Sequence, residues 1–131
     1  MPIFRRRANP DDVAQLRAEV ADMAAAPDEV VMIDIRDPRE LEREGMIPGA
    51  FHAPRGMLEF WVDPESPYHK EIFASGKNFV FFCAGGLRSA LATKTVQDMG
   101  LENVAHIEGG FGAWRKAGKP VEAPKEAPAK S

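Results

Sequence analysis

The single cysteine of this 131-residue chain, Cys83, stands in the stretch FVFFCAGGLRSALA, residues 79–92. An apolar run precedes the cysteine, and two glycines and Arg88 follow it. A thiolate is a strong nucleophile, and glycines let a short loop curl until several backbone N–H groups point at one centre. Such donors, a nearby cation and a helix amino terminus all favour a thiolate over a thiol. The stretch therefore predicts a nucleophilic cysteine that its loop holds as an anion.

The segment after the cysteine is the predicted binding loop, which we call the cradle. It consists of Ala84, Gly85, Gly86, Leu87, Arg88 and Ser89. We expect a helix to begin at Ser89, whose hydroxyl either caps that helix or donates to the loop. Arg88 would add a positive charge and a planar fork of donors.

Two other interpretations of this stretch are possible. A lone cysteine at the end of a strand is often a small buried hydrophobe. The glycine pair, the arginine and the helix start that follow Cys83 favour a reactive group instead. A nucleotide-binding P-loop would need the spacing G-x-x-x-x-G-K-[ST] with its lysine, and this stretch has neither.

Around the cysteine, apolar runs of strand length alternate with segments of helical period. This order is typical of an α/β fold with a central, mostly parallel sheet and helices on both faces. Strands are predicted at residues 29–36, 49–54, 78–82 and 103–107. Helices are predicted at residues 10–23, 38–44, 56–62, 67–74 and 89–99, and a final helix runs through Trp114.

The chain length fits one domain, which we assign to residues 1–120. Residues 121–131 space prolines among alanine, lysine and glutamate, so we expect a disordered C-terminal tail. Strand 78–82 is predicted to be central, which places Cys83 at its carboxyl end. Ligands bind at the carboxyl ends of the strands in open α/β sheets.

Other polar residues also follow predicted strands. Asp34, Arg36 and Glu40 could act as acid-base machinery, but residues this close can satisfy one another, so we predict that they support the structure. Arg55 follows another strand end and is predicted to reach the rim of the pocket. His106 has no metal partner at ligand spacing and is predicted to be an ordinary polar position.

The composition excludes several classes of function. The formal net charge of −3 argues against nucleic acids and anionic membrane surfaces as partners. No apolar run approaches the roughly 20 residues that a membrane span requires. One cysteine cannot form an internal disulfide or a multi-thiolate metal site, so we expect no metal, no cofactor and a cytoplasmic location.

Four short motifs together resemble a single rhodanese domain, a sulfurtransferase module. They are DIRDPRE at 34–40, GMIPGA at 45–50, CAGGLRS at 83–89 and GGFGAW at 109–114, in the order and spacing of that family. The resemblance covers residues 29–121 and implies the three-layer fold of the family. It also implies that Cys83 accepts sulfane sulfur as a persulfide and that the cradle surrounds it.

The resemblance implies an enzyme of the thiosulfate sulfurtransferase type. Such an enzyme moves sulfane sulfur from thiosulfate, a persulfide or a polysulfide to cyanide, a small thiol or a protein thiol. Since Arg88 is the only cation in the cradle, we expect dianionic thiosulfate to be a poorer donor than persulfides or polysulfides.

Two other functions are weighed against this one. A sulfur-relay or binding module of the same fold, without turnover, would need the same persulfide. Cysteine phosphatases of related architecture resemble this site but have five residues between cysteine and arginine. Because this chain has four, a phosphatase is the less favoured alternative.

Overall fold

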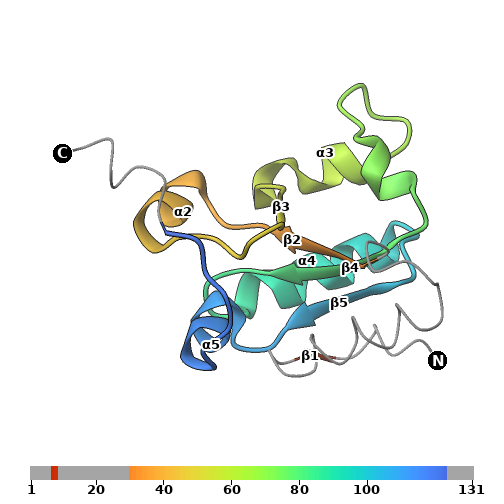
Figure 1. Ribbon diagram of the computed structural model, residues 1–131. Coiled ribbons are helices and arrows are strands. Elements are labelled where there is room, and N and C mark those ends of the chain that lie inside the picture. The colour runs from red at the N-terminus through yellow and green to blue at the C-terminus, as the bar shows by residue number, and fades with distance from the viewer. Residues whose placement is uncertain (1–6, 9–29, 124–131) are drawn as a thin grey trace.

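The computed structural model describes residues 7–8 and 30–123, and its strands form one five-stranded sheet. Every strand pair is parallel. The order β1-β5-β4-β2-β3 runs from bottom to top in Figure 1. The strands are β1 Arg7–Ala8, β2 Val30–Asp34, β3 Phe51–His52, β4 Asn78–Phe82 and β5 Val104–Ile107. The predicted α/β class and the central place of the strand before Cys83 are both confirmed.

Short helical segments connect these strands. They are α2 Pro38–Glu44, η3 Arg55–Met57, α3 Leu58–Val62, η4 Glu71–Ala74, α4 Leu87–Asp98 and α5 Gly110–Lys116. The helix predicted at residues 10–23 lies outside the described residues. No helix in the described part of the chain has the length and apolar character to cross a bilayer.

Helices cover both faces of the sheet, as predicted. Alternate residues of a strand point to opposite faces, and β4 sends Val80 and Phe82 into one apolar cluster and Phe79 and Phe81 into another. The first cluster includes residues of α5, and the second includes residues of α3, η4 and α4. The sheet is therefore buried on both sides, which is why β4 consists of a continuous apolar run.

The helix α2 shows how local sequence sets an element that later positions the site. Asp37 caps its first turn and Glu40 completes a capping box, while Pro38 occupies the first turn. Gly45 ends the helix with a φ of 89°, a conformation that favours glycine.

The chain after α5 returns to this same turn. Glu122 exchanges two backbone hydrogen bonds with Met46, with N–O distances of 3.0 and 2.7 Å, and Val121 packs against the apolar cluster of α5. The tail predicted to be disordered from residue 121 is therefore ordered as far as this bridge. The remainder of that predicted tail, residues 124–131, lies outside the described residues.

Candidate active site

Cys83 follows β4 and is only 1% exposed. Its Sγ accepts hydrogen bonds from the backbone N–H groups of Gly86, at 3.1 Å, and Ser89, at 3.4 Å. The Sγ also lies 3.6 Å from the Ser89 hydroxyl oxygen. The cradle therefore curls around the sulfur, and two of its amides donate to it.

The helix after the cradle begins earlier than predicted. The first residue of α4 is Leu87, and Gly86 precedes it in the left-handed region with a φ of 102°. Ser89 is thus in the first turn, where backbone N–H groups lack partners within the helix, and its own N–H is free to reach the sulfur. Of the two roles predicted for the Ser89 hydroxyl, donation to the loop is the one observed, because it donates to the Gly86 carbonyl at 3.2 Å.

The first turn of α5 contacts the backbone of Cys83 and of the cradle. A Cβ on Gly110 would lie 2.3 Å from the carbonyl oxygen of Cys83, so only glycine fits there. The next two N–H groups, of Phe111 and Gly112, donate to the carbonyl oxygens of Cys83 and Ala84 at 2.7 and 3.0 Å. Gly110, the first residue of α5, therefore permits a close backbone approach that holds the cradle in place.

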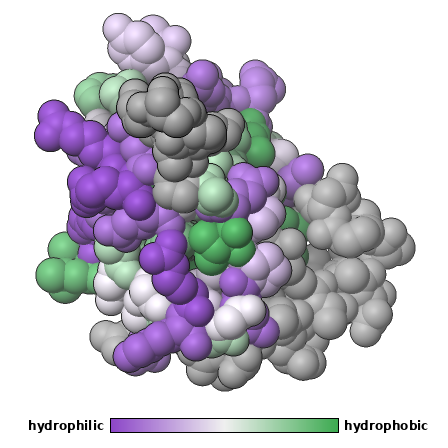
Figure 2. Space-filling view, turned by 60° about the vertical axis from the view of Figure 1, so that its left-hand side comes forward, coloured by the Kyte–Doolittle hydropathy of each residue, from purple (hydrophilic) through white to green (hydrophobic). Residues whose placement is uncertain are grey.

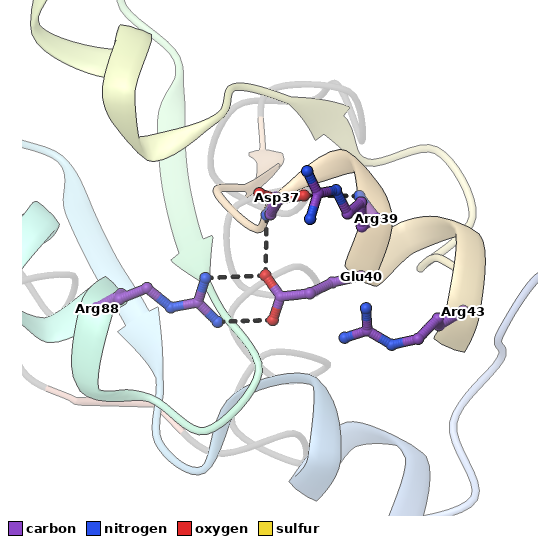
Figure 3. Close-up of a pocket in the computed structure, with 5 residues that line it drawn as sticks. All are labelled: Asp37, Arg39, Glu40, Arg43 and Arg88. Carbon is purple, nitrogen blue, oxygen red and sulfur yellow. Dashed lines mark hydrogen bonds and ion pairs between the residues drawn. The ribbon is translucent and has the colours of Figure 1, made fainter.

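The cation of the cradle is paired with a carboxylate from α2. Arg88 donates to both carboxylate oxygens of Glu40, at 2.9 and 2.8 Å. Figure 3 shows the two side chains reaching toward one another across the pocket. Glu40 was predicted to belong with Asp34 and Arg36, but the fold brings it to Arg88 instead. The charge of Arg88 is consequently largely offset.

Ionisation of this pair follows from its geometry. The hydrogen bonds from Arg88 lower the pKa of Glu40 to about 2, against an ordinary value of 4.5, despite the opposing effect of burial. The same contacts raise the pKa of Arg88 above its usual range, and the neighbouring Cys83 contributes less. Both groups are therefore charged at neutral pH.

We expect the replacement Glu40→Gln to weaken the dependence of stability on acid pH. The pKa of Glu40 is lower in the folded chain than its ordinary value, so its contribution is complete above about pH 4.5 and is lost as pH falls toward 2. The free energy of unfolding in urea, measured from pH 7 to 2, should differ between the two proteins at neutral pH and converge in acid. Glu42→Gln, an exposed change on the same helix, is the matched control. Parallel curves for wild type and Glu40→Gln would contradict the pairing.

Asp34 and Arg36 form the structural pair that the sequence predicted. The Arg36 Nε and Nη2 donate to the two oxygens of Asp34 at 2.9 and 2.7 Å, and both side chains are buried. Nη2 also donates to the Gly45 carbonyl at 2.8 Å, and the guanidinium lies 4.1 Å from the Phe111 ring centre. The pair thus joins the end of α2 to α5, beneath the cradle.

Neutral donors contribute most to the acidity of the nucleophile. Burial raises the pKa of the Cys83 thiol, but hydrogen bonds from the Ser89 hydroxyl and from the amides of Ser89, Gly86 and Gly85 outweigh it. The net effect is a pKa below the ordinary value of the thiol. Because Arg88 is paired with Glu40, its charge favours the thiolate less than the charge of an unpaired arginine would.

Arg55 has contacts of its own. Its Nη1 donates to Glu59 at 2.6 Å, and its backbone N–H donates to the Ile35 carbonyl at 3.1 Å. Neither contact joins the arginine to the cradle, so its place at the rim stays a prediction.

His106 is the residue whose place the sequence analysis missed. Its Nδ1 lies 3.0 Å from the Ser89 hydroxyl oxygen, which in turn contacts the Cys83 sulfur. The alternation of β5 was a usable signal, since it sends His106 to the same face as Val104, which packs in the cluster of α4. Local sequence patterns do not predict the strand order, which places β5 beside β4.

Two pockets adjoin the cradle and share no lining residue. One, of about 400 Å³, is lined by Asp37, Arg39, Glu40, Arg43 and Arg88 (Figure 3). The other, of about 440 Å³, is lined by Gly85, Gly86, Leu87, Ala90, His106, Glu108 and Gly109. Figure 2 shows that the side of the molecule carrying α2 and α5 is largely hydrophilic, with separate hydrophobic patches. Within the described residues, no three His, Cys, Asp or Glu side chains gather as a metal site would require.

Comparison with known families and sequences points to one family. The family described as "Rhodanese-like domain" matches residues 16–117. A protein named "Sulfurtransferase" from Allochromatium vinosum is 30% identical over 101 residues, which cover 77% of this chain and 86% of that protein. An uncharacterized protein from Synechocystis is 34% identical over 77% of this chain, and the match spans 51% of its length.

Solved structures show the same fold. A protein of unknown function from Rhodopseudomonas palustris, described as a possible tyrosine phosphatase, is 61% identical with a TM-score of 0.78. That match covers 89% of this chain and 84% of the other. A rhodanese-related protein from Thermoplasma volcanium is 27% identical with a TM-score of 0.63, and the match covers 88% of this chain and 96% of the other.

Proposed function

This chain belongs to the rhodanese-like domain family, and from that membership we propose that it is a sulfurtransferase that carries sulfane sulfur on Cys83. The observation that supports the proposal most directly is the sulfur itself, which accepts hydrogen bonds from the amides of Gly86 and Ser89. These donors favour an anion at neutral pH, first as a thiolate and then as a persulfide. The similar protein from Allochromatium vinosum that is named a sulfurtransferase points the same way.

The reaction has two half-reactions that share the same site. In the first, the Cys83 thiolate attacks the outer sulfur of the donor and forms a new S–S bond, while the donor's own S–S bond breaks and its electron pair leaves with the remainder. In the second, an acceptor nucleophile takes the terminal sulfur, and Cys83 leaves as a thiolate. The amides of the cradle stabilise negative charge on sulfur at each stage. Because Cys83 is 1% exposed, the cradle must shift locally for a donor to reach the sulfur.

The charge near the cradle affects which anionic sulfur donors can bind. Arg88 is paired with Glu40, so little uncompensated positive charge remains for a small dianion such as thiosulfate. Arg39 and Arg43 of α2 also line the adjoining pocket, but both are exposed, so solvent and salt screen their charge. We therefore propose persulfides or polysulfides as donors, and a small or protein thiol as the natural acceptor. One cysteine in the whole chain agrees with a reducing compartment, and we place the reaction in the cytoplasm.

Loading with sulfur tests this function. The purified protein is incubated with thiosulfate, glutathione persulfide or polysulfide, the donor is removed, and the intact mass is measured. We expect one added sulfur atom that maps to Cys83, with thiosulfate as the slowest donor. Cyanide should strip the sulfur and yield thiocyanate. If no donor adds sulfur and no thiocyanate forms, the enzyme proposal is wrong.

Turnover separates the enzyme from the relay module. An enzyme regenerates its thiolate with cyanide or a small thiol and completes many cycles. A relay module would load sulfur but would not release it to such small acceptors, because its persulfide would pass sulfur only to the thiol of a partner protein. Steady-state thiocyanate formation with an excess of donor and cyanide therefore distinguishes the two.

A cysteine phosphatase is the second candidate, since the 61% identical structure is described as a possible tyrosine phosphatase. Two features weigh against it here. Four residues separate Cys83 from Arg88, one fewer than in the phosphatases that this loop resembles, and Arg88 is held by Glu40. We expect negligible hydrolysis of aryl phosphates, and clear hydrolysis that depends on Cys83 would favour the phosphatase.

A further inference from the structure

A buried hydrogen-bonded row of three side chains leads away from the nucleophile. The Cys83 Sγ lies 3.6 Å from the Ser89 Oγ, and that oxygen lies 3.0 Å from the His106 Nδ1. All three residues are buried, with exposed fractions of 1% for Cys83, 0% for Ser89 and 7% for His106. Nucleophile, hydroxyl and imidazole therefore interact with little interference from solvent.

The fold accounts for this juxtaposition. His106 pairs in register with Phe81 of β4, and Cys83 follows the same strand two residues later. Ser89 lies in the first turn of α4, the helix that packs against the face of the sheet to which His106 points. The hydroxyl thus sits between the end of one strand and the middle of its neighbour.

The single hydrogen of the Ser89 hydroxyl links the protonation of Cys83 to that of His106. A hydroxyl has one hydrogen to donate. The thiol donates to the Ser89 oxygen, which can then give its own hydrogen to a neutral His106 Nδ1 or to the Gly86 carbonyl. A thiolate instead needs the hydroxyl hydrogen for itself, so the Nδ1 must then carry a hydrogen and donate to the Ser89 oxygen. Ionisation of Cys83 and the hydrogen on Nδ1 are therefore coupled.

We propose that His106 is a positioning residue that accepts the proton of the Cys83 thiol through Ser89. The S–H bond breaks as its proton joins the Ser89 oxygen, and the former hydroxyl proton forms an N–H bond with Nδ1. A thiol and a neutral imidazole thus become a thiolate and an imidazolium, with Ser89 unchanged. The reverse transfer returns the proton to Cys83. The inference concerns the nucleophilic cysteine of the proposed function and rests on it.

The surroundings of His106 include a pocket and a carboxylate. The imidazole lines the pocket of about 440 Å³, which Glu108 also lines. Within the sheet its neighbours in register are Phe81 of β4 and Arg7 of β1. Glu108 and the more distant pair of Arg88 and Glu40 are the charged side chains to consider when pH profiles are compared.

The test is a double-mutant cycle on the rate at which iodoacetamide alkylates Cys83 as pH varies. Asn at position 106 can hydrogen-bond to Ser89 but cannot bind a proton, so we expect His106→Asn to raise the pH of half-maximal rate. A rise of about one unit would slow alkylation roughly tenfold below that midpoint. Ser89→Ala should raise it at least as much, and the double variant should match Ser89→Ala. His69→Asn is the matched histidine control.

Two outcomes would overturn the inference: a wild-type profile for His106→Asn, or effects of the two changes that add in the double variant. Thermal unfolding of each variant checks the fold. Should His106→Asn fail to fold, nitrogen NMR of the histidine rings in the unaltered protein decides. The Nδ1 signal of His106 should then shift over the pH interval in which Cys83 becomes reactive, and this shift should be absent in Cys83→Ser. An Nδ1 signal of His106 that does not change when Cys83 ionises would contradict proton transfer between the two residues.

Failure of the proposed function would look different. If no sulfur donor loads Cys83 but the alkylation cycle behaves as described, the row operates in a protein that is not a sulfurtransferase. If sulfur loads normally and the cycle is additive, the sulfurtransferase stands without a role for His106.

Discussion

Replacing Cys83 by serine is expected to abolish sulfur transfer while leaving the fold intact. The serine hydroxyl is similar in size to the thiol, and the amides of Gly86 and Ser89 that donate to the sulfur can donate to an oxygen. A hydroxyl remains protonated at neutral pH and is a poor nucleophile toward sulfur. The rate of thiocyanate formation should fall by about 10³-fold or more, and the intact mass should show no added sulfur.

The control for this replacement is the stability of the variant itself. Unfolding in urea should show Cys83→Ser within about 1 kcal/mol of wild type, since the change preserves most of the volume of a buried site. Wild-type protein alkylated at Cys83 should be equally inactive. Near-normal thiocyanate production by a folded Cys83→Ser would remove Cys83 from the reaction.

Replacing Asp34 by alanine is expected to have the largest effect on stability. Arg36 is 0% exposed, and Asp34 accepts hydrogen bonds from both its Nε and its Nη2. Without the carboxylate, the buried guanidinium would keep the hydrogen bond to the Gly45 carbonyl and the rings of Phe82 and Phe111, none of which carries a compensating charge. Breaking one partner of a buried pair costs about 3–5 kcal/mol. The free energy of unfolding at pH 7, from urea titration, measures this loss.

The chain offers a matched control on its surface. Asp98 pairs with Lys94 at 2.8 Å, but the two side chains are 65% and 70% exposed. Asp98→Ala should therefore lower the free energy of unfolding by less than about 1 kcal/mol. Equal losses for the two alanine variants would show that the buried pair does not stabilise the fold as its geometry indicates.

Much of the fold could be predicted from local patterns. The strand β4 has the predicted bounds, Asn78–Phe82, because a continuous apolar run between polar turns is typical of a buried parallel strand. The helix α2 begins and ends as its capping residues indicate. In the cradle, Gly86 takes the positive φ that the glycine pair was predicted to allow, whereas Gly85 does not.

Helix boundaries near the cradle were less predictable. The sequence predicted that α4 begins at Ser89, because serine is a favourable capping residue. In the structure Gly86 turns the chain with a positive φ, so the helix can begin directly at Leu87. The close approach of Gly109 to Gly86 helps to set this turn, and no local pattern reveals it.

By itself the sequence determined the α/β class, the position of Cys83 at the end of a central strand and the loop that closes around its sulfur. The partners of the cradle were decided only by tertiary structure. Arg88 and Glu40 are 48 residues apart, and Ser89 and His106 are 17 apart. Contacts over such separations depend on which strands lie side by side and which helix covers which face. Burial of the whole apolar surface selects that arrangement, so short motifs identify the loop around the cysteine but not the residues that contact this loop from other elements.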